Sequence, residues 1–120
     1  MPYVDGFVVP VPNANRDSYV EMAKKGWEVF QRHGAISMVE CWGDDVPDGK
    51  LTDFRRAVQC KPDETVVFSW VTWPDRAARD RGNKAMMEDP AMKDMSEMPF
   101  DGKRMIYGGF APVFQSEAKR

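Results

Sequence analysis

Apolar side chains recur along the chain at two different spacings, which separate candidate strands from candidate helices. Short runs rich in β-branched and aromatic residues predict extended segments. These runs are Tyr3–Val9, Ile36–Trp42, Phe54–Cys60, Thr65–Trp73 and Met105–Phe114. The first run is expected to end near Pro10, and turn formers at 61–64 indicate that the third and fourth runs form a hairpin.

Helical spacing follows the first and fourth of these runs. A helix is expected from about Asn15 to His33, where Asn13 or Asn15 suits the N-cap and Gly34 suits a left-handed stop. Two more helices are expected, one after Pro74 and Asp75 and a short one from Pro90 through Met92 and Met95. This order predicts a ferredoxin-like α+β sandwich of split βαβ type with an antiparallel sheet, carrying either one extra strand or a broken second strand.

Two of the predicted strands are apolar on both faces. In the run 65–73, Phe68 and Trp70 point to one side of the sheet, and Val71 and Trp73 point to the other. Helices of this fold cover only one face, so the other needs a second cover. The sequence therefore predicts a homodimer formed through the sheet face.

Composition and charge exclude several classes of protein. The chain has 120 residues with a net charge of −2, both signs being interspersed, which disfavours nucleic acid as a partner. It contains no apolar run long enough for a membrane span. We expect one domain over residues 1–115, followed by a flexible polar tail over 116–120. The two cysteines have no disulfide spacing and the first residues no secretory pattern, so a cytoplasmic location is expected.

No motif for a cofactor, a metal or a nucleophile is present in the sequence. His33 is the only histidine, and its place before Gly34 is typical of a helix cap. Acidic residues at 44–53 favour a solvated turn over a cation site, because their spacing does not match an EF-hand. We therefore expect neither a cofactor nor a bound metal.

Asp5 is unusual because it interrupts an apolar strand. A buried carboxylate needs hydrogen bonds or a cation, and the candidate cations are Arg55, Arg56, Lys103 and Arg104. A structural ion pair is the first interpretation. A proton acceptor in a pocket is the second.

The chain is rich in aromatic residues and methionines. Core and dimer packing explain most of them, and a pocket that stacks a planar ligand between sheet and helices is the alternative. The methionines that would form its pliant wall are Met86, Met87, Met92, Met95, Met98 and Met105. Candidate ligand-binding residues are Tyr3, Trp42, Arg55, Trp70, Trp73, Arg104 and Tyr107, with Asp5 as the candidate catalytic residue.

Several long segments of the chain have an unusual composition, namely YVDGFVVPVP at 3–12, ECWGDDVPDGK at 40–50, VVFSWVTWP at 66–74, MMEDPAM at 86–92 and MPFDGKRMIYGGF at 98–110. Together these segments resemble the YbaA-like bacterial family of unknown function. The resemblance covers residues 2–114 and implies a dimeric α+β barrel.

The leading hypothesis is a cytoplasmic dimer that binds a small, partly aromatic molecule between sheet and helices. The first alternative is a cofactor-independent oxygenase or isomerase. The second is a structural or stress-related dimer without a ligand.

Overall fold

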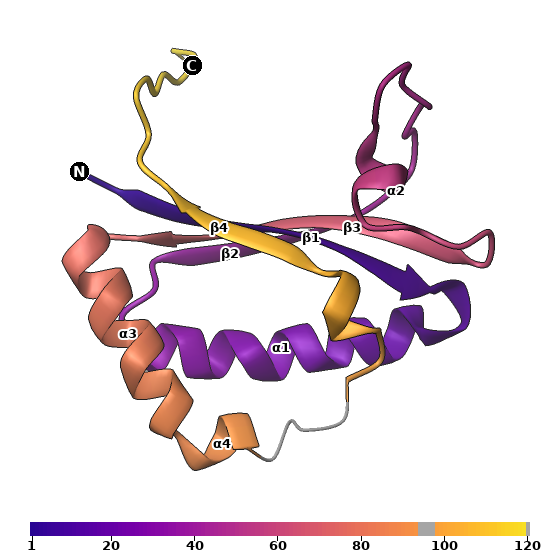
Figure 1. The fold of residues 1–120 in the computed structure, drawn as a ribbon. Coiled ribbons are helices and arrows are strands. Elements are labelled where there is room, and N and C mark those ends of the chain that lie inside the picture. The colour runs from indigo at the N-terminus through magenta and orange to yellow at the C-terminus, as the bar shows by residue number, and fades with distance from the viewer. Residues whose placement is uncertain (94–97, 120) are drawn as a thin grey trace.

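A four-stranded antiparallel sheet with its two longest helices packed on one face forms the protein (Figure 1). The computed structural model describes residues 1–93 and 98–119. Its strands, in the sheet order β2-β3-β1-β4, are β1 (Tyr3–Pro12), β2 (Ser37–Trp42), β3 (Glu64–Trp73) and β4 (Ile106–Phe110). Its helices are α1 (Arg16–Arg32), α2 (Phe54–Ala57), α3 (Arg76–Glu88) and α4 (Pro90–Lys93), with 3₁₀ turns η1 (Asn13–Asn15) and η2 (Gly102–Arg104). The predicted α+β fold of split βαβ type is confirmed.

The hairpin predicted for 54–60 and 65–73 is wrong. Residues 54–57 form the helix α2, and β3 pairs with β1 and β2 instead. The Asp53 carboxylate causes this difference, because it accepts a hydrogen bond from the backbone N–H of Arg56 at 2.7 Å and caps the helix. In the part of the chain that the structure describes, there is neither an extra strand nor a broken second strand.

The first and last strands in the sequence also differ in length from those predicted. β1 continues through Pro10 to Pro12, and β4 pairs with it only from Val4 to Val8. Pro10 therefore lies past the end of β4, where its missing N–H removes no ladder bond to that strand. The last strand stops at Phe110 rather than at Phe114.

The core is built where α1 and α3 meet the sheet. Trp73 is fully buried and packs with Val29, Val71 and Met86. A Cβ atom at Gly82 would lie 2.4 Å from the Trp73 ring. Only glycine therefore allows α3 to approach the sheet this closely.

The ends of α1 are held by tertiary contacts as well as by local signals. Gly34 has a φ of 108°, so the predicted left-handed stop is confirmed. Of the two predicted N-cap residues, Asn15 is the N-cap of α1, but its side chain makes no hydrogen bond to the first turn of the helix. The Asn15 amide instead donates to the Pro99 carbonyl at 2.9 Å.

The sheet face opposite the helices is apolar and exposed. Val39, Phe68, Ile106 and Phe110 lie on it, with 37%, 45%, 47% and 62% of their surfaces exposed. The loop with α2 and the C-terminal segment rise from opposite ends of this face (Figure 1). Both faces of the sheet are therefore apolar, as the strand patterns predict.

Candidate functional site

A cavity of about 220 Å³ lies between the sheet and α1. Its floor crosses three strands, since Phe7 of β1 and Glu40 of β2 are both register partners of Ser69 in β3. Tyr19 and Met22 of α1 form part of its roof. Further apolar walls come from Phe30, Met38, Met92, Met98, Phe100 and Met105.

Three polar side chains meet in this cavity and are called here the Tyr19–Glu40–Ser69 cluster. The Tyr19 hydroxyl donates to Glu40 Oε1 at 2.6 Å, and Ser69 is the neighbour of Glu40 across the β2–β3 pair. Burial raises the pKa of Glu40, while hydrogen bonds from Tyr19 and Ser69 partly offset the rise. Burial first, and then the charge of Glu40, raises the pKa of Tyr19. The cluster thus combines a carboxylate of increased basicity with two hydroxyl groups.

Glu40 stands between the cavity and solvent. Tyr19, Met38 and Glu40 line both the cavity and an open groove between α1 and the edge strand β2. This position explains why Glu40 exposes much of its surface while its carboxylate is held by Tyr19. A ligand that enters from the groove would meet this carboxylate first.

A second hollow, of about 310 Å³, adjoins the first. The two share Phe7, Phe30, Met92 and Met105 as walls. Its polar residues are Asp5, Arg79, Asn83 and Tyr107. Carboxylates therefore line both hollows, Glu40 in one and Asp5 in the other.

Asp5 is buried as expected, but none of the predicted cations pairs with it. Arg79 of α3 does so, with its Nη2 3.0 Å from Asp5 Oδ1, and the Trp73 indole N–H donates to Asp5 Oδ2 at 3.0 Å. The Arg79 guanidinium also lies 5.2 Å from the centre of the Tyr3 ring. The first interpretation of Asp5, a buried ion pair with an arginine, is confirmed. The four cations proposed as its partner are wrong, because the partner is Arg79.

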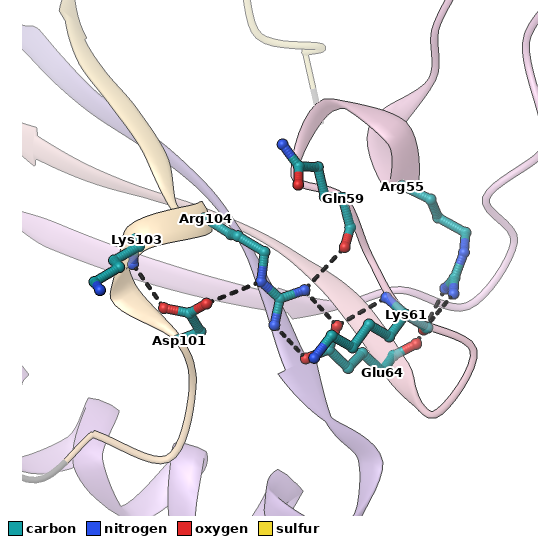
Figure 2. Close-up of polar contacts among 7 residues, drawn as sticks. All are labelled: Arg55, Gln59, Lys61, Glu64, Asp101, Lys103 and Arg104. Carbon is teal, nitrogen blue, oxygen red and sulfur yellow. Dashed lines mark hydrogen bonds and ion pairs between the residues drawn. The ribbon is translucent and has the colours of Figure 1, made fainter.

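Two of those partners, Arg55 and Arg104, converge on Glu64 instead (Figure 2). Arg104 holds both carboxylate oxygens of Glu64 at 2.7 Å and also bonds to Asp101. Arg55 donates to the Glu64 carbonyl at 3.1 Å. The hydrogen bond from Arg104 holds the pKa of Glu64 at about 2. These contacts join η2, the start of β3 and α2, and they place both arginines outside the two hollows.

The remaining candidate residues are dispersed. Trp42 lies under the guanidinium of Arg16, 5.5 Å from it, and the Trp70 ring packs against Phe68 at a 50° tilt on the exposed sheet face. Tyr107 is 74% exposed and borders the larger hollow. The predicted ligand-binding residues therefore do not form one site.

Most of the methionines predicted to form a pliant wall do line the hollows. Met86, Met92, Met98 and Met105 contribute to one or both of them, and Met87 borders the larger one although it is mostly exposed. Met95 lies outside the described residues. A wall of flexible side chains can adapt its shape to a ligand.

Histidine and the acidic residues are among the side chains of this protein best suited to bind a metal ion. His33 is the C-cap of α1, and its Nε2 lies 2.8 Å from Asp89 Oδ2, so that it ties α1 to the start of α4. Within residues 1–93 and 98–119, no group of three histidine, cysteine or acidic residues is arranged to hold a metal ion. None of the helices in those residues is long and apolar enough to cross a membrane.

The sequence reasoning missed the Tyr19–Glu40–Ser69 cluster. A signal for Glu40 was present, because it interrupts an apolar strand just as Asp5 does and shares a face with Met38 and Trp42. Its hydroxyl partners lie on other elements, which the strand pattern alone does not reveal.

Solved structures with the same arrangement of strands and helices define the class of fold. The chain is similar to a NIPSNAP domain protein from Burkholderia xenovorans, with a TM-score of 0.62, 13% identity and coverage of 96% and 99% of the two chains. It is also similar to SnoaB, a cofactor-independent oxygenase from Streptomyces nogalater, with a TM-score of 0.57, 14% identity and 95% coverage of each chain. A third similar structure is that of a dimeric ferredoxin-like protein from an uncultured marine organism. The TM-score is 0.56 and the identity 11%, and the match covers 97% of this chain and 100% of that one. The fold is ferredoxin-like α+β.

The sequence comparisons then identify the family. Residues 2–102 match the model of a family described as a protein of unknown function, DUF1428, and the chain belongs to this family. It is 57% identical over 114 residues to the uncharacterized protein YbaA of Escherichia coli strain K12, covering 94% of this chain and 97% of that protein. The same figures hold for YbaA of Shigella flexneri. The predicted membership of the YbaA-like family is confirmed.

Proposed function

We propose that the protein binds a small, partly aromatic molecule in the cavity between the sheet and the helices. The observation that carries this proposal is the cavity itself, with aromatic and methionine walls around one polar cluster. Ligand pockets are mostly apolar, with a few polar groups that orient the ligand. The adjoining hollow gives room for a molecule larger than the cavity alone could hold.

An enzyme is the second candidate function. It is favoured by the basic carboxylate of Glu40 in the cavity wall, a group that a passive pocket does not need. One protein of similar fold is a cofactor-independent oxygenase, which makes an oxygenase or isomerase a natural form of this alternative. A purely structural dimer needs no cavity, so the cavity counts against the third alternative.

We also propose that two copies pair through the exposed sheet face. The apolar side chains Val39, Phe68, Ile106 and Phe110 lie together on this face, and because each is already partly buried, covering the rest of each is worth roughly 0.5–2 kcal/mol. A second copy of the same chain offers a surface of the same kind. A protein of similar fold is described as dimeric, which supports the choice of partner. The free Cys41 and Cys60 agree with a reducing, cytoplasmic location.

Native mass spectrometry of gently purified protein tests the binding proposal. We expect a dimer that carries a small molecule, released when the protein is denatured. Ala23→Phe, which places a ring in the cavity, should lose the extra mass, and Ala77→Phe on the exposed side of α3 should keep it. Equal retention by both variants would place the ligand elsewhere, and bare protein throughout would count against binding.

A further inference from the structure

Glu40 is held differently from the carboxylates that form ion pairs with arginine in the described part of the chain. These pairs join Asp5 to Arg79, Asp53 to Arg56, Glu64 to Arg104, and Asp89 to Arg32. Glu40 is instead held by the neutral hydroxyl of Tyr19. Glu40 is partly exposed and borders both the open groove and the cavity, so its carboxylate is within reach of a ligand that enters from the groove.

We propose that Glu40 is a catalytic base that removes a proton from a planar, mainly apolar ligand carrying an acidic C–H or O–H group. This inference rests on the proposed ligand cavity. In the step, the ligand C–H or O–H bond breaks, its electron pair stays on the ligand, and a new O–H bond forms on Glu40. The ligand anion then isomerises and is reprotonated by the same carboxyl group, so no cofactor is required.

The geometry of the cavity suits this step. Glu40 lines the cavity, and the bond from Tyr19 engages Oε1, while a carboxylate has further acceptor capacity. The aromatic rings of Phe7, Phe30 and Phe100 border the same space and give a planar ligand surfaces to stack on. A carboxylate in such surroundings is a stronger base than one in water.

The charged and titratable groups around Glu40 come from two elements. Tyr19 and Lys24 of α1 face it, and Ser69 of β3 lies beside it. Lys24 is exposed and bonds to Glu21 at 3.3 Å, so it does not neutralise Glu40. Proton transfer should therefore follow the titration of Glu40, with activity that rises as the pH increases through its raised pKa.

Ring opening of nitrobenzisoxazole tests this inference, because that planar probe reacts when a base removes one C–H proton and releases a coloured phenolate. We expect saturable turnover by the intact protein. Glu40→Gln should lower kcat/KM by about a hundredfold. Glu88→Gln, at an exposed position on α3, is the matched control and should not change it. Tyr19→Phe should shift the pH dependence of kcat/KM to higher pH, because it removes a hydrogen bond that stabilises the ionised carboxylate of Glu40.

Binding of the probe is measured separately, by NMR of the Met22 and Met38 methyl groups in the cavity. Probe that binds without being turned over would overturn the role of Glu40 and leave the binding proposal intact. Turnover lost in Asp5→Asn but kept in Glu40→Gln would also overturn it. Probe that does not bind would count against the cavity as a ligand site, and with it against the inference.

Discussion

Glu40 should destabilise the fold that carries it. Burial raises the pKa of Glu40 in the folded protein above its value in the unfolded chain. Ionisation of Glu40 therefore lowers the free energy of unfolding. The loss begins as the pH rises past the unfolded-state pKa and is complete above the folded-state pKa. Glu40→Gln keeps an acceptor for Tyr19 and removes the charge. Because Glu40 is partly solvated, we expect the variant's melting temperature to exceed that of the natural protein by only about one degree at pH 7 and to match it at acidic pH, by differential scanning calorimetry.

Asp5 provides the contrast at the same scale. It is buried and paired with Arg79, so Asp5→Asn leaves Arg79 with only the exposed Asp80 as an ionic partner and should cost about 3 kcal/mol. If Glu40→Gln raises the stability of the fold and Asp5→Asn lowers it, then Asp5 stabilises the structure and Glu40 does not. A Glu40→Gln protein that melts lower at pH 7 would place Glu40 with the structural pairs.

At the scale of elements, the Glu64–Arg104 pair joins the start of β3 to η2 (Figure 2). The pKa of Glu64 is lowered to about 2, so its stabilising effect is complete above its ordinary value of 4.5 and is lost as the pH falls toward 2. Glu64→Gln should therefore melt lower than the natural protein, by roughly 5 °C at pH 7. Thermal melts by circular dichroism should show this difference shrinking toward zero near pH 2. A difference independent of pH would mean that packing, not charge, is lost.

Which elements could be predicted from the sequence depends on how local their causes are. The strand at 65–73 and the stop at Gly34 follow from neighbouring residues, and both were predicted. The helix α2 was missed because a single cap, Asp53, outweighs the apolar run after it. The partner of Asp5 was missed because Arg79 reaches it from α3, and no strand pattern encodes that approach.

At the scale of the whole molecule, the two proposed surfaces lie on opposite faces of one sheet and should be separable. A lysine on the exposed face would meet its own copy near a two-fold axis, so Ile106→Lys and Phe110→Lys should shift the protein from dimer to monomer at micromolar concentration. Analytical ultracentrifugation measures this shift. Met87→Lys, at an exposed apolar residue on the helical side, is the matched control and should remain dimeric.

The monomeric variants should keep the cavity, because all three cluster residues come from one copy: Tyr19 lies on α1, and Glu40 and Ser69 lie on the sheet face that α1 covers. Probe binding at the Met22 and Met38 methyl groups should therefore match that of the natural protein. Loss of binding on dissociation would mean that the partner copy holds the sheet in its binding form. Variants that stay dimeric would show that the exposed face is not the interface.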